Sequence, residues 1–255
     1  MSDSAVWDSL AFFLTRLKKM PCCDSAELRP GKGFCVSTRS SFASDNWAFF
    51  QAPLDGIAPI ETAVSFFNAQ NRPFIWPLFN DSDAALLNRF GLTEKGRLRA
   101  MSWDIDITHG AANNISFLHV NSPDLVLRWA ETSWRGFGEE APSPREFRDL
   151  VLACAADPCL KLVMASDCDR DIGSFIISFP PDRGDAGIYY FSVIPEFRRR
   201  GAATAMMIEA GLLALSSKKC RIILQATPDG ALFYSHFGFN TLFEIPLFSL
   251  SDDVF

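Results

Sequence analysis

Residues 188–204 read Ile-Tyr-Tyr-Phe-Ser-Val-Ile-Pro-Glu-Phe-Arg-Arg-Arg-Gly-Ala-Ala-Thr, and the other predictions are built around them. The pattern predicts a strand over 188–194 that ends at a proline, then a basic turn, then an apolar helix from about Ala202 to Ser217. Backbone N–H groups at the start of a helix are unpaired and partially positive, and the glycine lets them approach an anion closely. Three consecutive arginines add positive charge there. The turn therefore suits a diphosphate.

Strand and helix signals alternate on both sides of this stretch. Downstream, the sequence predicts a strand over 221–226, a short helix over roughly 230–237 and a closing strand over 240–250. Ser122 and Ser143 have the properties of helix-capping residues upstream. The upstream prediction is a strand, two helices and two strands, over 115–120, 122–134, 143–156, 160–166 and 172–179. This order indicates a mixed α/β domain.

The first half carries weaker signals of the same kind. It predicts an amphipathic helix near the N-terminus, helices over 60–70 and 83–90, and strands over 46–51, 73–79 and 98–107. The small polar segment His109-Gly-Ala-Ala-Asn-Asn114 is typical of a domain boundary. We therefore predict two domains, a smaller α/β domain over residues 1–112 and a second domain over residues 113–255.

Composition and charge exclude several classes of protein. The 255 residues are 48% hydrophobic and 21% charged, which is typical of globular chains and excludes full disorder. The formal net charge of −6 argues against nucleic acid as a partner. The apolar N-terminal stretch precedes its basic residues, the wrong order for a signal peptide, and no apolar run reaches the ~20 residues of a membrane span. We expect a cytoplasmic protein without a membrane partner.

The cysteines favour reduced thiols over a disulfide scaffold or a metal site. There are seven cysteines, no Cys-x-x-Cys spacing occurs, and three histidines are present to complete a ligand set. An odd count without paired spacing, in a chain of this size, is more typical of a reducing compartment. We therefore predict no bound metal.

The basic turn resembles the acetyl-CoA signature of the GNAT (GCN5-related N-acetyltransferase) superfamily. That signature is Gln/Arg-x-x-Gly-x-Gly/Ala, preceded by a Val-x-Pro strand end. Here Arg198-x-x-Gly201-x-Ala203 follows Val193-Ile-Pro195. The order and spacing of strand, turn and helix fit the family as well.

A second family element lies further along the chain. Residues 227–239 read Thr-Pro-Asp-Gly-Ala-Leu-Phe-Tyr-Ser-His-Phe-Gly-Phe, which is similar to the family pattern Asn-x-x-Ala-x-x-Leu-Tyr-x-x-x-Gly-Phe. The resemblance covers about residues 115–255. It implies an α/β fold with a mixed, mostly antiparallel central sheet flanked by helices.

The resemblance also implies roles for individual residues. Main-chain groups of Phe191–Val193 pair with the pantetheine amides, and the Val193 amide faces the acetyl carbonyl oxygen. Amides from Arg199 to Thr204 hold the pyrophosphate. The implied acetyl-CoA-binding residues are Phe191, Ser192, Val193, Arg198, Arg199, Arg200, Gly201, Ala202, Ala203, Thr204 and Thr227, with Thr227 in place of the usual Asn. The implied catalytic residue is Tyr234, near the thioester sulfur.

One family feature is missing. Some members carry a glutamate about six positions before the residue equivalent to Val193, and Gly187 stands there in this chain. An alkyl amine with a pKa near ~10.4 is almost fully protonated at pH 7, so a base or water relay has to deprotonate it. Asp185 and Glu131 are the candidate substitutes, acting through water.

The resemblance therefore implies an acetyl-CoA-dependent N-acetyltransferase that acts on a primary amine by direct transfer. The missing carboxylate and the Asn-to-Thr change leave an alternative, a catalytically silent acyl-CoA-binding or regulatory module. The amine acceptor, the acyl-group preference and the oligomeric state stay open.

Residues 86–92 are similar in sequence to residues 233–239. The two stretches read Leu-Leu-Asn-Arg-Phe-Gly-Leu and Phe-Tyr-Ser-His-Phe-Gly-Phe, and a predicted strand follows each. In an internal repeat, Leu87 takes the position of Tyr234 and cannot donate a proton. No Arg-x-x-Gly motif lies upstream of Leu87. We interpret the first half as a degenerate copy used for structure or substrate binding, with chance similarity as the alternative.

Overall fold

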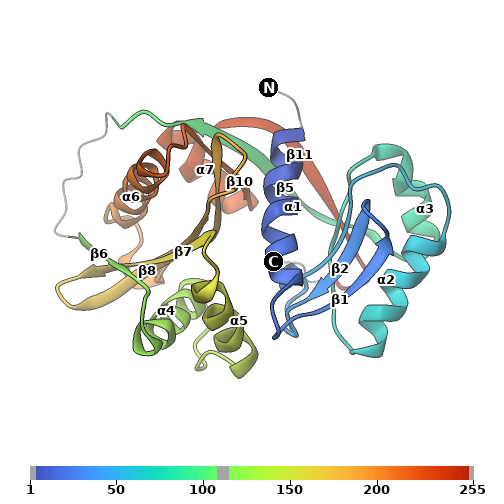
Figure 1. Cartoon of the computed structure of the whole chain (residues 1–255), viewed down its shortest axis with the longest axis horizontal. Helices are drawn as coiled ribbons and strands as arrows, with labels where there is room; N and C mark the ends of the chain where they lie inside the picture. The colour runs from blue at the N-terminus through green and yellow to red at the C-terminus, as the bar shows by residue number, and fades with distance from the viewer. Residues whose placement is uncertain (1–3, 108–114, 253–255) are drawn as a thin grey trace. The chain divides into compact units, whose positions relative to one another are not determined.

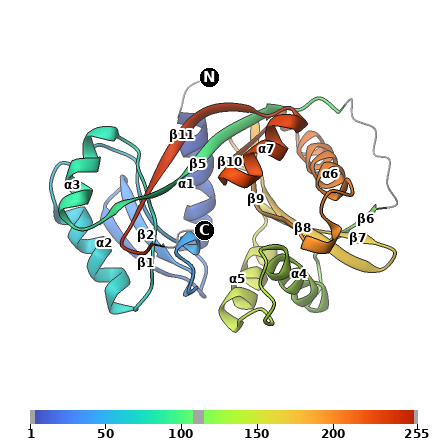
Figure 2. The same cartoon turned by 180° about the vertical axis from the view of Figure 1, so that it is seen from behind.

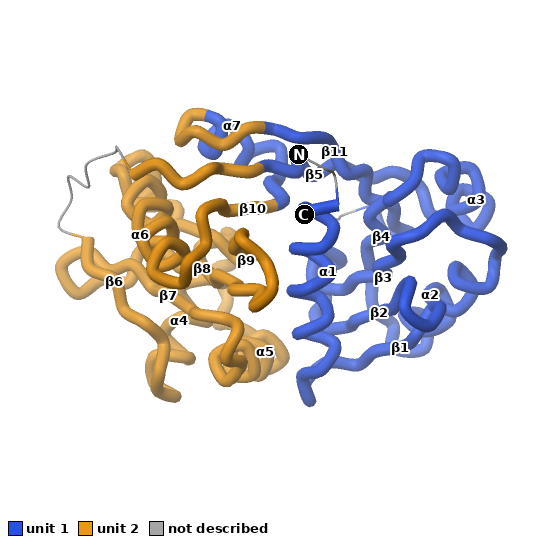
Figure 3. Tube along the Cα trace, turned by 45° about the horizontal axis from the view of Figure 1, so that its top comes forward, with its two compact units in different colours: residues 1–101, 225–235, 241–255 blue, residues 102–224, 236–240 orange. Residues whose placement is uncertain are grey.

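The structure is a computed structural model that describes residues 4–107 and 115–252. The chain forms two compact units, drawn in blue and orange in Figure 3. Unit 1 comprises Met1–Met101, Gln225–Ser235 and Thr241–Phe255, and unit 2 comprises Ser102–Leu224 and His236–Asn240. The predicted boundary at residue 112 lies outside the described residues. The units are not simple halves, because the chain returns from unit 2 to unit 1 near its end.

Unit 1 contains a three-stranded antiparallel sheet in the order β1-β2-β3. Helices α1 and α2 cover its two faces (Figure 1). Buried side chains repeat at helical spacing along α1, from Val6 through Leu10 and Leu14 to Leu17, so this amphipathic helix turns one face to the core. The elements are α1 (Ser4–Lys18), β1 (Asp24–Arg29), β2 (Gly33–Ser37), η1 (Ala43–Asp45), β3 (Asn46–Phe50), α2 (Ala58–Ala69), β4 (Trp76–Pro77), η2 (Asp81–Asp83) and α3 (Ala84–Arg89).

Unit 2 is a sheet with helices on both faces. Its strands run in the order β10-β9-β8-β7-β6. Helices α4 and α5 cover one face and α6 covers the other, as Figures 1 and 2 show. The elements are β6 (Ile115–His119), α4 (Pro123–Gly136), α5 (Arg145–Ala156), β7 (Leu160–Asp167), β8 (Arg170–Ser178), β9 (Asp185–Val193), η3 (Pro195–Phe197), α6 (Ala202–Ser216) and β10 (Arg221–Ala226).

Besides β10, whose last two residues belong to unit 1, three further elements begin in one unit and end in the other. They are β5 (Thr93–Asp104), α7 (Pro228–Phe237) and β11 (Asn240–Ser249). The larger sheet has eight strands in the order β4-β11-β5-β10-β9-β8-β7-β6. Its described pairs are antiparallel except β9 with β10. The predicted fold class, a mostly antiparallel sheet flanked by helices with a smaller N-terminal sheet, is confirmed.

The predicted order of elements in the second half is also confirmed. The acidic turn that joins β7 to β8 contains Cys168 and Asp169, which have φ of +46° and +67°. The antiparallel pair β1–β2 is the main element that the sequence did not predict. None of the described helices has the length and apolar character needed to cross a membrane. The described part of the chain also holds no group of three or more potential metal-ligating residues.

Candidate active site

Strand β9 carries a bulge shortly before its end. Its antiparallel register with β8 pairs Ile176 with Tyr189 and Ser174 with Ser192, so two β9 residues oppose one β8 residue between those pairs. One of the two, Tyr190, has φ of +49°, in the left-handed region. The bulge bends the strand immediately before its last three residues, which are the predicted pantetheine-binding positions.

Strand β10 pairs with the beginning of β9. The parallel register joins Arg221–Ile223 to Asp185–Gly187. Strand β9 itself continues to Val193, so Phe191–Val193 lie beyond the stretch over which this register extends. The end of β9 is thus positioned mainly by its antiparallel pairing with β8.

The chain enters α6 through a short loop with two left-handed residues. The turn η3 is followed by Arg199 at φ +60° and Gly201 at φ +83°. Gly201 is the N-cap of α6, and the Ala205 N–H donates to the Gly201 carbonyl (3.0 Å). The N–H groups of Ala202–Thr204 lie in the first turn of α6, where no helix carbonyl is available to accept them. They therefore form the positive end of the helix. That these N–H groups hold a pyrophosphate stays a prediction.

The three consecutive arginines have different surroundings. Arg198 donates from Nε to the Val193 carbonyl (3.0 Å) and from Nη2 to the carbonyl of the last residue of α4 (2.9 Å). Arg198 therefore ties the loop to the end of β9 and to α4. Arg199 is exposed, and the Arg200 guanidinium lies over the Phe197 ring, 5.6 Å from its centre. Arg199 and Arg200 thus supply positive charge at the surface of the loop.

Ser192 lies opposite Ser174 in the pairing of β9 with β8, and its side chain is held as well. Its Oγ lies 3.3 Å from the Ser174 Oγ and donates to the Ser133 carbonyl (3.4 Å). A Cβ on Gly136 would stand 2.3 Å from the Ser192 Oγ, and a Cβ on Gly173 would stand 2.8 Å from the Ser192 carbonyl oxygen. Both glycines are therefore needed for this packing. The sequence analysis missed them because neither belongs to a recognisable motif.

Thr227 and Tyr234 belong to unit 1, whereas the β9–α6 loop belongs to unit 2. The Thr227 Oγ1 accepts the N–H of Gly230 (3.3 Å) and so caps α7. Tyr234 is 8% exposed, and its ring packs edge-on against Phe233 with the ring centres 5.1 Å apart. Burial raises the pKa of the Tyr234 phenol above its usual value. The hydroxyl therefore stays protonated and able to donate.

Both carboxylates considered as base substitutes have partners. Asp185 forms an ion pair with Arg183 (3.0 Å) and lies at the opposite end of β9 from Val193, roughly 26 Å away along the strand. Such a distance is too long for one water to bridge. Glu131 accepts hydrogen bonds from the N–H and the hydroxyl of Ser143, so it holds the segment before α5. Glu131 also lines a surface cavity, which makes it the better placed of the two.

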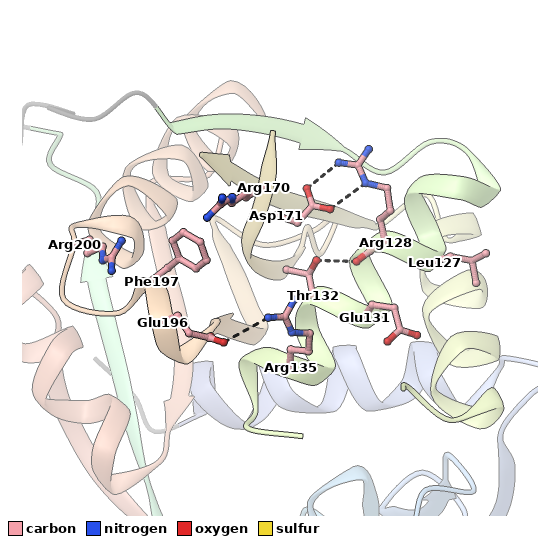
Figure 4. A pocket seen from close by; sticks show the side chains of 10 residues that line it. All are labelled: Leu127, Arg128, Glu131, Thr132, Arg135, Arg170, Asp171, Glu196, Phe197 and Arg200. Atoms are coloured by element: carbon pink, nitrogen blue, oxygen red, sulfur yellow. Dashed lines mark hydrogen bonds and ion pairs between the residues drawn. The ribbon is translucent and has the colours of Figure 1, made fainter. Parts of the chain in front are cut away.

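That cavity has a volume of about 680 Å³ and opens beside the β9–α6 loop, entirely within unit 2 (Figure 4). Its walls are α4, the start of β8 and the loop that follows β9. No sequence motif pointed to it, because its lining comes from three segments that are distant in the chain. Four of the lining residues are arginines: Arg128, Arg135, Arg170 and Arg200.

Comparison with known families gives a match within the second half of the chain. A family model described as an acetyltransferase (GNAT) domain matches residues 159–241. The match begins at β7, includes the β9–α6 loop and ends at the start of β11. No curated protein sequence matches the chain significantly.

Solved structures share the fold over nearly the whole chain. A GCN5-related N-acetyltransferase from Kribbella flavida has a TM-score of 0.68 at 15% identity, covering 96% of this chain and 95% of that one. A tandem GNAT protein from the clavulanic acid biosynthesis pathway has a TM-score of 0.62 at 10% identity, with 97% and 95% covered. A GCN5-related N-acetyltransferase from Sphaerobacter thermophilus has a TM-score of 0.59 at 14% identity, with 86% and 80% covered. The chain carries a GNAT acetyltransferase domain and has the fold of the GNAT superfamily.

Proposed function

We propose that this protein transfers an acetyl group from acetyl-CoA to a primary amine by direct attack, as a cytoplasmic N-acetyltransferase. The observation that carries the proposal is the loop between β9 and α6, where Gly201 at φ +83° starts the helix. The amides of Ala202–Thr204 and the charge of Arg199 and Arg200 suit a diphosphate. A family match over 159–241 supports the same reading.

Residues of this chain can also hold the rest of the donor. The main chain of Phe191–Val193 offers N–H and carbonyl groups at strand spacing, which suits the amides of a pantetheine arm lying as an added strand. The bulge at Tyr190 and the contacts of the Ser192 side chain fix the direction of that strand end. When bound, acetyl-CoA supplies a reactive thioester. Thr227 supports the proposal less directly, since its hydroxyl already caps α7.

The transfer itself needs stabilisation of two developing charges. We assign the Val193 N–H to the carbonyl oxygen, which becomes negative as the amine attacks. We assign the Tyr234 hydroxyl to the leaving sulfur. A phenol with a raised pKa is a weaker acid than a thiol of pKa ~8.5, so Tyr234 donates a hydrogen bond or gives up its proton late. A covalent enzyme intermediate is unnecessary in this scheme, because the amine attacks the thioester directly.

The second candidate function is a silent acyl-CoA-binding or regulatory module. Three observations favour it: Gly187 stands where some family members have a glutamate, Asp185 is paired with Arg183, and Glu131 is engaged by Ser143. An enzyme with these features acts best on an amine of low pKa, which needs less help from a base.

Release of the CoA thiol across a panel of primary amines of different pKa distinguishes the two functions. For the enzyme we expect amine-dependent release that is fastest with weakly basic amines at neutral pH. Tight acetyl-CoA binding without release for any amine in the panel would overturn the enzyme in favour of the module.

A further inference from the structure

Over the described residues, the two sheets end at the strands β1, β3, β4 and β6, and the first three edges are protected against pairing with another chain. Strand β1 carries Asp24, Glu27 and Arg29, each in an ion pair, and its register with β2 shifts near its end. Strand β3 is covered by Ile75, which exchanges two main-chain hydrogen bonds with it (2.9 Å each). Strand β4 has two residues, and Pro77 is one of them. Charge, a bulge, cover and proline are the usual means of protecting a sheet edge.

Strand β6 has none of these features. It is the last strand of the larger sheet in the part of the chain that the structure describes (Figure 1). Its residues read Ile-Ser-Phe-Leu-His, without a lysine, an acidic residue or a proline. The isoleucine, phenylalanine and leucine are large apolar residues that are only half-buried. An uncharged apolar edge of this kind favours pairing with a further strand.

The register of β6 with β7 shows which main-chain groups of β6 remain for a further strand. The Val120 N–H donates to the Leu162 carbonyl (3.0 Å), and the antiparallel register continues back along the whole of β6. Because hydrogen-bonded and non-hydrogen-bonded pairs alternate in such a ladder, every second residue of β6 bonds to β7. The N–H and C=O groups of the other residues, Ile115, Phe117 and His119, therefore point away from β7.

We propose that β6 pairs antiparallel with β6 of a second copy of this chain, which joins the two larger sheets into one. Phe117 is the middle one of the outward-pointing residues, so it lies at the two-fold axis opposite Phe117 of the second copy. Ile115 then lies opposite His119 of the second copy, and each opposed pair exchanges two main-chain hydrogen bonds. Every outward group of one strand thus finds its partner in the other, as a two-fold interface requires. Strand β6 carries no charged residue that would select a different partner, whereas its spacing matches itself.

The helix beside β6 adds apolar surface to the same interface. The His119 Nε2 lies 3.8 Å from the Glu209 Oε1 of α6, so the outward-pairing residues turn their side chains to the α6 side of the sheet. Two exposed leucines, Leu212 and Leu215, follow Glu209 by about one and two helical turns. A two-fold axis perpendicular to the sheet places both copies of α6 on this side. The leucines then extend the apolar contact beyond the paired strands.

Sedimentation equilibrium of the full chain over a concentration series tests the pairing. We expect wild-type protein to have the mass of two chains. Phe117→Lys and Phe117→Glu each place like charges directly opposite each other at the axis, so each variant alone is expected to have the mass of one chain. An equimolar mixture of the two variants is expected to regain the mass of two chains, because opposite charges then meet. The matched control is Leu152→Lys, at an exposed leucine of α5, which is expected to keep the wild-type mass.

A second variant disrupts the main chain of β6 and leaves Phe117 in place. His119→Pro removes an outward N–H that makes no bond to β7, so the fold keeps its hydrogen bonds and the dimer loses two of its own. We expect this variant also to have the mass of one chain. Thermal unfolding verifies that each variant is folded.

The outcomes bear on the interface and not on acetyl transfer, because the proposed function does not depend on the second copy. A wild-type mass of one chain at every concentration overturns the inference. A dimer that persists in both Phe117→Lys and His119→Pro places the interface elsewhere and overturns it as well. A mixture of the Lys and Glu variants that stays monomeric overturns the pairing of Phe117 with its own copy.

Discussion

The loop after β3 in unit 1 and the loop after β9 in unit 2 occupy corresponding places in their units. They differ in which group provides negative charge to the backbone N–H groups of the loop. In unit 2, β9 leads into α6, and β10 then pairs parallel to β9. In unit 1, β3 leads into α2, and the chain returns to pair parallel to β3 through Trp47 and Ile75. Both loops therefore belong to the same strand–loop–helix–strand arrangement. The residues of the two loops differ.

In unit 1, a carboxylate from η2 lies at the loop between β3 and α2. Both carboxylate oxygens of Asp83 accept the N–H of Leu54, at 3.2 and 3.1 Å, and Asp83 is 8% exposed. Next to Leu54 in the same loop, Asp55 forms an ion pair with Arg29. At the corresponding place, the unit 2 loop carries arginines and the left-handed Gly201. The unit 1 loop thus already has a carboxylate at one of its N–H groups, whereas for the unit 2 loop we propose an anionic ligand.

The largest effect is expected for Tyr234, whose position is taken by Leu87 in the predicted internal repeat. Tyr234→Phe keeps the ring and removes the hydroxyl. We expect kcat to fall by about 10²–10⁴, the usual contribution of a general acid, with acetyl-CoA affinity nearly unchanged. Steady-state kinetics under conditions where chemistry limits the rate measure the effect.

The pH profile of the wild-type enzyme supplies an independent control for Tyr234. Burial raises the pKa of this phenol, so the protonated form persists to higher pH than in a free tyrosine. We therefore expect no loss of kcat from phenol ionisation up to about pH 10. Wild-type turnover in Tyr234→Phe would remove the residue from the mechanism.

The next largest effect concerns the two loop glycines. Gly201→Val places a β-branched residue at φ +83° in the loop of unit 2, and Gly56→Val places one at φ +156° in the loop of unit 1. We expect Gly201→Val to weaken acetyl-CoA binding by at least about tenfold and Gly56→Val to leave it unchanged. Titration of the two folded variants decides this. Equal affinities would show that the unit 2 loop does not hold the diphosphate.

The smallest effect is expected for the internal anion of unit 1. Asp83→Ala leaves the Leu54 amide without its acceptor and lowers the free energy of unfolding by about 1–2 kcal/mol. The exposed neighbour Asp81 provides the matched control, Asp81→Ala, for which we expect little change. Urea unfolding measures both. An unchanged stability in Asp83→Ala would mean that its carboxylate is dispensable in this loop.

Much of the fold of unit 2 could be predicted because each element has its own local signal. Strong caps and apolar periodicity placed α4 and β10 within a few residues of their observed bounds. The pair β1–β2 lacks such signals. β1, Asp24–Arg29, contains no β-branched residue, and its pairing with β2 is what stabilises it as a strand.

The site could be predicted only where its chemistry lies in the backbone. The motif placed Gly201 in the turn between strand and helix, and the structure shows it there in the left-handed region. The hydrogen-bond partners of the side chains could not be predicted, because the spacing of residues in the sequence does not show which groups a long side chain contacts in the folded protein. Arg198 bonds to the carbonyl of Val193, and Glu131 bonds to Ser143. The arginine-rich cavity is formed by three segments that are distant in the chain, so no local sequence pattern predicted it.

The number of acetyl-CoA molecules bound per chain tests the contrast between the two loops most directly. Calorimetric titration of the wild-type protein gives this number. Because the Asp83 carboxylate already accepts the Leu54 N–H in unit 1, whereas the unit 2 loop has the left-handed Gly201, the predicted result is one molecule per chain, bound at least about tenfold more weakly in Gly201→Val. Two molecules per chain, or one molecule still bound with full affinity in Gly201→Val, would contradict the assignment of acyl-donor binding to unit 2.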